Sequence, residues 1–250
     1  MIGYHDAVAR LTDGAVLRGT QALAPGDALG RVLAAAIVSD LALPPFDNAA
    51  LDGVALATGG MPVPDGRAWE IGARIGAGEP APQDDALAWE IMTGAPLPAR
   101  ADTVVPVERI EALPASASGA SRIRVLGEVA AGVNIRRRGE DVMPGQSVLP
   151  AGHVLDAASL MLIAGLGIDR IPVARRPRVA VLATGREIVA AGERLPPGGI
   201  HDATSPYLAL AIAAAGAEVQ RIVRVGDDVA AFQAALDAAL AEDVDLVLST

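Results

Sequence analysis

Lysine and cysteine are both missing from the 250 residues, and aromatic side chains are scarce. All 20 basic residues are therefore arginines. Without lysine the chain offers no Schiff-base amine and no lysine for a Walker-type phosphate loop, which excludes pyridoxal chemistry and that class of nucleotide site. Without cysteine there are no disulfides, thiolate zinc sites or thiol nucleophiles. His5, His153 and His201 are too far apart in the sequence to indicate a metal cluster.

An excess of positive charge is also missing. Thirty acids against 20 arginines give a net charge of −10, which argues against a general nucleic-acid binder. The amino terminus contains Tyr4, His5 and Asp6 where a signal peptide needs basic residues and then an apolar run. The longest apolar stretch, residues 208–217, is about half of the ~20 residues that cross a bilayer. We therefore expect a soluble, cytoplasmic protein that binds neither nucleic acid nor membranes.

What is present is a globular composition, with 52% hydrophobic residues. Helical spacing of apolar residues predicts one helix over residues 6–18 and another over residues 29–38. Between residues 41 and 141, short runs of valine, isoleucine and leucine are interrupted by prolines and glycines, which is typical of a compact β domain. After a turn at residues 144–145, helical spacing returns over residues 157–165.

From residue 178 onward, strands alternate with helices. The predicted strands cover residues 179–183, 219–225 and 244–248, and the predicted helices cover residues 206–215 and 229–240. This alternation indicates a parallel α/β sheet. The last strand runs into Ser249 and Thr250 without a turn or cap, so we expect the natural protein to continue beyond this sequence.

Together these patterns predict a multidomain fold with α/β and β parts. Residues 1–40 and 142–176 are expected to form a helical and extended linker domain, into which the β domain of residues 41–141 is inserted. Residues 177–250 are expected to form a parallel-sheet α/β domain that is incomplete on its carboxyl side.

A loop opened by prolines and closed by a glycine places several polar side chains close together. It contains Asp47, Asn48 and Asp52, and such a loop can hold carboxylates rigidly. The alternative is structural: Asp47 and Asn48 form an Asx turn, and Asp52 with Gly53 forms a hairpin turn.

Three arginines, residues 136–138, lie beside Glu140 and Asp141 in this acidic chain. An arginine fork suits phosphate or another tetrahedral oxyanion, and an adjacent carboxylate can ligate a divalent cation. The alternative is a solvated, salt-bridged turn. A weaker signal is the hydroxyl of Thr93 before Gly94, because glycine lets the backbone approach an anion.

The predicted strand over residues 179–183 is followed by Thr184, Gly185 and, two residues later, Glu187. Ligands of open α/β sheets bind at the carboxyl ends of the strands, so Thr184 and Glu187 are placed for binding. The alternative is a capping box, because a threonine followed three residues later by a glutamate also begins helices.

The order of these segments resembles the molybdopterin molybdenumtransferase family, the molybdenum insertases that include MoeA and the gephyrin E domain. The matching segments are, in order, PPFDNAALDGVA, IMTGAPLP, NIRRRGED, ATGRE and LVLST. The similarity covers the chain from Gly30 to Thr250, and its most specific parts are residues 47–53 and 134–141.

The resemblance implies transfer of molybdenum from molybdate to adenylylated molybdopterin (molybdopterin-AMP), with release of AMP and with help from Mg²⁺. It implies that Asp52, Asp141 and Glu187 are catalytic and bind the metal. The expected substrate-binding residues are Thr93, Arg136, Arg137, Arg138, Thr184 and Asp227.

The resemblance also implies a homodimer with shared active sites, in which the β domain carrying Asp52 and Asp141 faces the α/β domain, with Glu187, of the other subunit. A molybdopterin adenylyltransferase and acceptor molybdoenzymes are the implied partners. Members of the family continue past the last strand into a glycine-rich motif and a fourth, β domain.

Three positions depart from the family pattern. Val54 stands where the family has a tyrosine, Arg186 stands where it has an aspartate, and His201 begins a divergent strand motif. The retained acids favour an enzyme, whereas Val54 and Arg186 favour the alternative of a non-catalytic paralogue that binds or carries molybdopterin or acts as a scaffold.

Overall fold

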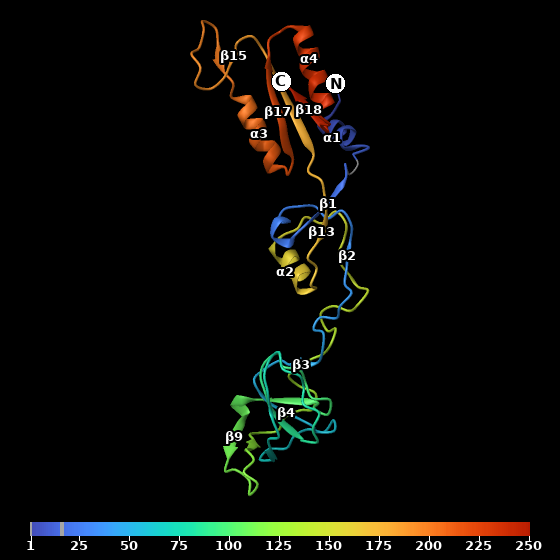
Figure 1. The fold of residues 1–250 in the computed structure, drawn as a ribbon, viewed down its shortest axis with the longest axis vertical. Helices are drawn as coiled ribbons and strands as arrows, with labels where there is room; N and C mark the ends of the chain where they lie inside the picture. The colour runs from blue at the N-terminus through green and yellow to red at the C-terminus, as the bar shows by residue number, and fades with distance from the viewer. Residues whose placement is uncertain (1, 16–17) are drawn as a thin grey trace. The chain divides into compact units, whose positions relative to one another are not determined.

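The computed structural model describes residues 2–15 and 18–250 (Figure 1). Within these residues the chain forms two compact units. The first consists of the residues up to Ala36 together with Leu149–Thr250, and the second is the continuous segment Ile37–Val148. Among the helices of the described residues, none is both long and apolar enough to cross a membrane.

The first unit contains a parallel sheet of three strands in the order β17-β14-β18. The strands are β14 (Arg178–Thr184), β17 (Glu218–Val225) and β18 (Leu246–Ser249). The central strand, β14, is buried from Val179 to Ala183 because it has a neighbour on each side and helices packed on it. A strand buried on both faces requires a continuous apolar run, so the prediction of a parallel α/β sheet is confirmed.

Two helices pack on this sheet and lie on either side of it in Figure 1. They are α3 (Thr204–Ala214) and α4 (Val229–Ala241). Helix α3 contributes Leu208 and Ile212 to a core cluster with Val181 of β14. Helix α4 begins after Asp228, whose carboxylate accepts a hydrogen bond from Ala230 N at 3.1 Å. This N-cap satisfies one of the free N–H groups at the start of the helix.

The same unit contains a smaller antiparallel sheet of β1 and β13, with Leu23 opposite Ile171. The remaining elements of the unit are α1 (Tyr4–Thr12), β1 (Thr20–Leu23), η1 (Pro25–Asp27), α2 (Ala157–Gly165), β13 (Ile171–Ala174), β15 (Ile188–Val189) and β16 (Ile200–His201). Helix α2 has the bounds predicted from the sequence. It begins after Asp156, whose carboxylate accepts from Ser159 N at 2.7 Å.

The helix predicted over residues 29–38 is wrong. Gly30 adopts φ +70°, a left-handed conformation that interrupts a helix. Val32 and Leu33 instead form isolated bridges with residues far along the chain, and Ile37–Val38 form strand β2. The spacing of apolar residues alone did not distinguish a helix from these short extended segments.

The helix predicted over residues 6–18 is shorter in the structure. Helix α1 ends at Thr12, after which Asp13 has an extended backbone and Gly14 has φ +75°. Two of the apolar residues on which the prediction rested, Val16 and Leu17, lie outside the described residues.

The second unit is made of short strands, in agreement with its proline and glycine punctuation. A four-stranded sheet has the order β6-β7-β4-β8, a three-stranded sheet has the order β5-β10-β9, and β11-β3 and β12-β2 form pairs. Besides β2, the elements are β3 (Asn48–Ala49), β4 (Gly53–Leu56), β5 (Ala68–Glu70), β6 (Arg74–Ile75), β7 (Ala88–Ile91), β8 (Thr103–Pro106), η2 (Val107–Arg109), β9 (Ile110–Leu113), β10 (Arg122–Val125), β11 (Ile135–Arg136) and β12 (Ser147–Leu149).

Strand β4 organises the core of this unit because both of its faces are buried. Successive side chains of a strand point to opposite faces. Val54 and Leu56 accordingly pack with Val105 in one apolar cluster, whereas Ala55 packs with Trp89 in another.

Mixed α/β content with a parallel sheet is therefore confirmed. The finer division into residues 1–40 with 142–176, residues 41–141 and residues 177–250 stays a prediction.

Candidate functional site

Backbone hydrogen bonds join three loops of the second unit around the predicted site residues. Strand β3 pairs with β11, which places Arg136 opposite Asn48. Gly94 N donates to Ala49 O at 2.8 Å and ties the turn that contains Thr93 to the same strand. The structure therefore brings together three motifs that lie far apart in the sequence.

Asp52 ends the loop before β4, and Thr93 fixes its carboxylate. Asp52 Oδ1 accepts hydrogen bonds from Thr93 N at 2.6 Å and from Thr93 Oγ1 at 2.7 Å. These bonds favour the ionised form and hold the pKa of Asp52 below its usual value. The side chain is exposed, and no described residue donates to Oδ2. Asp52 is thus an oriented, ionised carboxylate with one oxygen free for a ligand.

The hairpin turn considered for Asp52 and Gly53 is wrong. Gly53 is the first residue of β4 and lies between β7 and β8 in the four-stranded sheet. A Cβ atom on Gly53 would lie 1.9 Å from Val105 O. Glycine is therefore required here because two backbones approach closely.

Asp47 holds two of the three arginines, a role that the sequence analysis did not assign. Its Oδ1 accepts from Arg138 N, and its Oδ2 accepts from Arg137 Nη1, each at 2.7 Å. The bond from Arg138 N, followed by that from Arg137, holds the pKa of Asp47 below its usual value. The Asx-turn alternative is wrong for Asp47, which binds a distant loop. The only sequence signal was the charge itself, since the pairing of β3 with β11 is not visible in the sequence.

The salt-bridged turn considered for residues 134–141 is present. Arg136 forms an ion pair with Asp141, which raises the pKa of Arg136, and Glu140 Oε2 accepts from Arg137 N at 2.9 Å. These groups are largely exposed. Among the described residues the guanidinium of Arg138 forms no ion pair. The guanidinium of Arg138 therefore remains available to an oxyanion.

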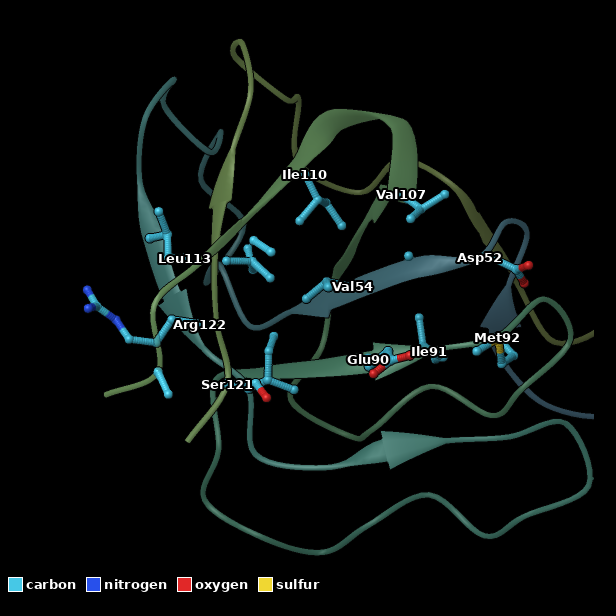
Figure 2. Close-up of a pocket in the computed structure, with 15 residues that line it drawn as sticks. Asp52, Val54, Glu90, Ile91, Met92, Val107, Ile110, Leu113, Ser121 and Arg122 are labelled. Atoms are coloured by element: carbon cyan, nitrogen blue, oxygen red, sulfur yellow. The ribbon is translucent and has the colours of Figure 1, made fainter. Parts of the chain in front are cut away.

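A cavity of about 470 Å³ opens beside Asp52. Figure 2 shows Asp52 and Met92 at one end, Arg122 at the other and Val54 between them. Val54, where the family pattern has a tyrosine, is therefore part of the wall. The volume falls within the range of about 300–1,000 Å³ that is usual for small-molecule sites. An organic group has room next to the Asp52 carboxylate.

The predicted metal ligands are divided between the two units. Carboxylate oxygens suit Mg²⁺, and Asp52 and Asp141 belong to the second unit, whereas Glu187 belongs to the first. In the described part of the chain, no group of three or more histidine, aspartate or glutamate side chains is placed to hold a metal ion. The Mg²⁺ site therefore stays a prediction.

In the first unit, Thr184 ends β14 at the carboxyl edge of the parallel sheet. Its backbone N–H donates to Thr250 O at 3.2 Å, and its hydroxyl donates to the same carbonyl. Gly185 follows with φ +139°, a conformation that favours glycine. No helix begins here, because the next element is β15, so the capping-box alternative is wrong. Thr184 lies where open α/β sheets bind ligands.

The acids beside this strand end differ in their partners. Asp227 Oδ2 lies 3.3 Å from Arg186 Nε, and both side chains are exposed. Glu187 forms no ion pair with any described residue. The arginine that departs from the family pattern thus partly neutralises Asp227, while Glu187 stays free.

A further carboxylate of this edge, Asp202, has a structural role. It is 5% exposed, its Oδ2 accepts from Arg224 Nε at 2.7 Å, and its Oδ1 accepts from Ser205 N at 2.9 Å. Burial alone would raise the pKa of Asp202, but the bonds from Ser205 and Arg224 outweigh it and lower the pKa. Asp202 therefore ties the start of α3 to the end of β17.

The fold and these loops define a class of two-unit protein, in which a β unit with an arginine–carboxylate network interrupts the sequence of a unit with a parallel α/β sheet. Two family models match this chain: "MoeA N-terminal region (domain I and II)" over residues 2–167, and "Probable molybdopterin binding domain" over residues 180–250. The chain belongs to the MoeA family.

Curated relatives and solved structures agree. The "Molybdopterin molybdenumtransferase 2" of Mycobacterium tuberculosis is 40% identical over 230 residues, which cover 89% of this chain and 55% of that protein. The "Molybdopterin molybdenumtransferase" of Synechococcus elongatus is 33% identical, with 88% and 55% covered. The crystal structure of the MoeA protein from Pyrococcus horikoshii OT3 matches with a TM-score of 0.87 at 28% identity, over 100% of this chain and 66% of that one. The chain spans about half the length of the curated relatives that it matches.

Proposed function

We propose that this chain carries part of the active site of a molybdopterin molybdenumtransferase. The reaction is transfer of molybdenum from molybdate to the dithiolene of adenylylated molybdopterin, with release of AMP. The observation that carries the proposal is the joining of the Asp52, Thr93 and arginine loops through the pairing of β3 with β11.

In this proposal, the second unit binds the anionic groups of the reaction. Arg136, Arg137 and Arg138 lie in one loop, and the guanidinium of Arg138 forms no ion pair with a described carboxylate. Such guanidinium groups suit tetrahedral oxyanions such as molybdate or phosphate. Asp52, ionised and oriented by Thr93, is one of the residues that line the adjoining cavity, and its second carboxylate oxygen accepts from no described residue.

The first unit would hold the pterin substrate at the carboxyl edge of its parallel sheet, with Thr184, Glu187 and Asp227 as contacts. A bound Mg²⁺ would supply Lewis-acid polarisation of a phosphoryl oxygen. Its proposed ligands are Asp52, Asp141 and Glu187.

We further propose that the protein is a homodimer with active sites shared between subunits. An adenylyltransferase that makes molybdopterin-AMP and molybdoenzymes that accept the finished cofactor would be its partners.

The proposal predicts that Asp52→Asn, Asp141→Asn and Glu187→Gln each slow AMP release from molybdopterin-AMP at least tenfold in the full-length protein. A tenfold loss corresponds to about 1.4 kcal/mol of transition-state stabilisation, a modest contribution for a catalytic carboxylate. The measurement is single-turnover AMP release, with folding checked by circular dichroism.

The matched controls are Asp85→Asn and Glu193→Gln, which neutralise exposed acids outside the predicted site. They are expected to keep the wild-type rate. Wild-type rates in all three site variants would overturn the catalytic assignment, and tight binding of molybdopterin-AMP without turnover by the wild type would identify a carrier.

A further inference from the structure

A second cavity, of about 460 Å³, lies entirely within the first unit. Four arginines and several small or apolar residues line it, and none of the described residues in its lining is acidic. The lining includes Arg18, Arg31, Arg175, Arg176, Pro177 and Gly216. In a chain with a net charge of −10, this is a local reversal of sign.

The cavity is at the opposite end of the parallel sheet from Thr184. Pro177 directly precedes β14, and Gly216 lies two residues before β17, so both belong to the amino edge of the sheet. Strand β14 is seven residues long, which at about 3.3 Å per residue separates the two edges by roughly 20 Å. This site is therefore distinct from the proposed pterin site at the carboxyl edge.

Arg31 is a buried cation without a paired anion. It is 8% exposed and donates through Nη2 to Ala174 O at 2.8 Å. Gln21 can turn its amide oxygen to the same guanidinium, at 2.9 Å from Nη1. Both acceptors are neutral, and no carboxylate of the described residues lies within ion-pair distance of Arg31. Burial, together with the positive charge of Arg176, lowers the pKa of Arg31, while the negative charge of Glu218 partly opposes this.

Of the other arginines, Arg18 and Arg175 share one carboxylate, that of Asp245, and Arg176 pairs with no described carboxylate. Asp245 accepts from Arg175 Nη2 at 2.9 Å, and its Oδ1 lies 3.6 Å from Arg18 Nε. Arg176 is only partly exposed, and its guanidinium has no hydrogen-bond or ion-pair partner in the described part of the chain. Two guanidinium groups, those of Arg31 and Arg176, therefore remain without a counter-ion.

The end of α3 compensates this charge only in part. Ala214 is the last residue of α3, and the carboxyl end of a helix carries roughly half a negative charge. This partial charge attracts arginines, but it does not balance the positive charges of two guanidinium groups. A ligand with two negative charges would balance them.

We propose that this cavity binds the phosphate group of a small organic phosphate. Arg31 and Arg176 contact the phosphate oxygens, in keeping with the match between guanidinium and tetrahedral oxyanions. Val32, Val154 and Ala214 supply apolar surface for the rest of the ligand. The binding site goes beyond the proposed molybdenum transfer and does not depend on it.

The test is calorimetric titration of the protein with phenyl phosphate at constant ionic strength. We expect saturable binding in the wild type, and at least tenfold weaker binding at this site in Arg176→Ala. Arg176 is partly exposed and makes no side-chain hydrogen bond to a described residue, so its removal leaves the fold intact, as circular dichroism would verify.

Two controls locate the site. Arg170→Ala and Arg194→Ala each remove an exposed arginine of the same unit outside the cavity. Both variants are expected to bind phenyl phosphate as the wild type does. Absence of saturable binding in the wild type, or binding that survives Arg176→Ala, would overturn the proposal.

Discussion

At the scale of single residues, the candidate site depends on side chains whose partners come from distant segments. Thr93 supplies both hydrogen bonds that orient Asp52, over a sequence separation of 41 residues. Asp47 reaches Arg137 and Arg138 over separations of 90 and 91 residues. Each of these carboxylates is useful only while the backbone that carries its partner stays in place.

At Gly53, strands β4 and β8 approach each other too closely for a larger side chain. We predict that Gly53→Ala lowers the free energy of unfolding by about 1–3 kcal/mol, the usual cost of overpacking. The added methyl group would clash with the carbonyl of Val105, and the strand must shift to relieve it. Urea unfolding followed by circular dichroism measures the change.

Gly26→Ala is the matched control, because a Cβ at Gly26 meets nothing within 4 Å and its backbone is not left-handed. It is expected to change stability by a few tenths of a kcal/mol at most. Equal stabilities of the two variants would contradict the close approach of β4 and β8.

At the scale of elements, the two-residue pair β3-β11 is the smallest sheet of the second unit and the one that builds the site. Only two residues of each strand are paired, so backbone hydrogen bonds stabilise this sheet weakly. Asp47 adds hydrogen bonds from its side chain to Arg137 and Arg138, in the loop after β11. The electrostatic support of this pair therefore changes with pH.

The sign of that change follows from the lowered pKa of Asp47. The unfolded chain, with an aspartate pKa of about 3.9, takes up the proton first as the pH falls, so unfolding becomes easier toward acid pH. The stabilisation is complete above the unfolded pKa and is lost as the pH falls through the folded pKa. We predict that wild type exceeds Asp47→Asn in unfolding free energy at pH 6, and that the difference shrinks toward pH 3.

Urea titrations of both proteins across this range measure the difference. Its size is modest because the Asp47 side chain is 39% exposed, so solvent screens the interaction. A difference that stays constant between pH 6 and pH 3 would show that Asp47 acts through packing and not through its charge.

Sequence analysis succeeded for elements whose signal is local. Helix α2, the three strands of the parallel sheet and helices α3 and α4 follow from apolar spacing, because each buries a continuous face within one short segment. The two-residue strands β15 and β16 were not predicted. It failed for residues 29–38, whose partners lie more than a hundred residues away. The role of Asp47 was missed because its arginine partners, 90 and 91 residues away, are brought to it by strand pairing. The role of Asp202 was missed because its ion pair with Arg224 depends on the position of β17.

At the scale of the whole molecule, the predicted catalytic acids are divided between two compact units. Our proposal interprets this division as an active site that two subunits of a homodimer share. The proposal can be tested without a structure of the dimer.

We predict that full-length Asp52→Asn and Glu187→Gln variants complement each other when they are refolded together. Random exchange makes about half of the dimers mixed, and each mixed dimer has one site with both lesions and one with none, so about a quarter of the wild-type activity should return. The measurement is AMP release by the mixture. Activity no greater than that of the two parents, in a verified mixed dimer, would show that each site is built within one subunit.

The pairing of β2 with β12 makes the second unit a cassette, that is, a continuous segment whose two ends lie side by side. Ser39 N donates to Gln146 O at 3.0 Å, and Gly145 N donates to Ser39 O at 2.7 Å. Paired strands are about 4.7–4.9 Å apart, so residues 40–145 leave and rejoin the chain at nearly the same point. A turn of a few residues can close that gap with little loop entropy. Excision or exchange of the whole cassette therefore leaves the path of the remaining chain unchanged, which makes this boundary a natural point for recombination between relatives.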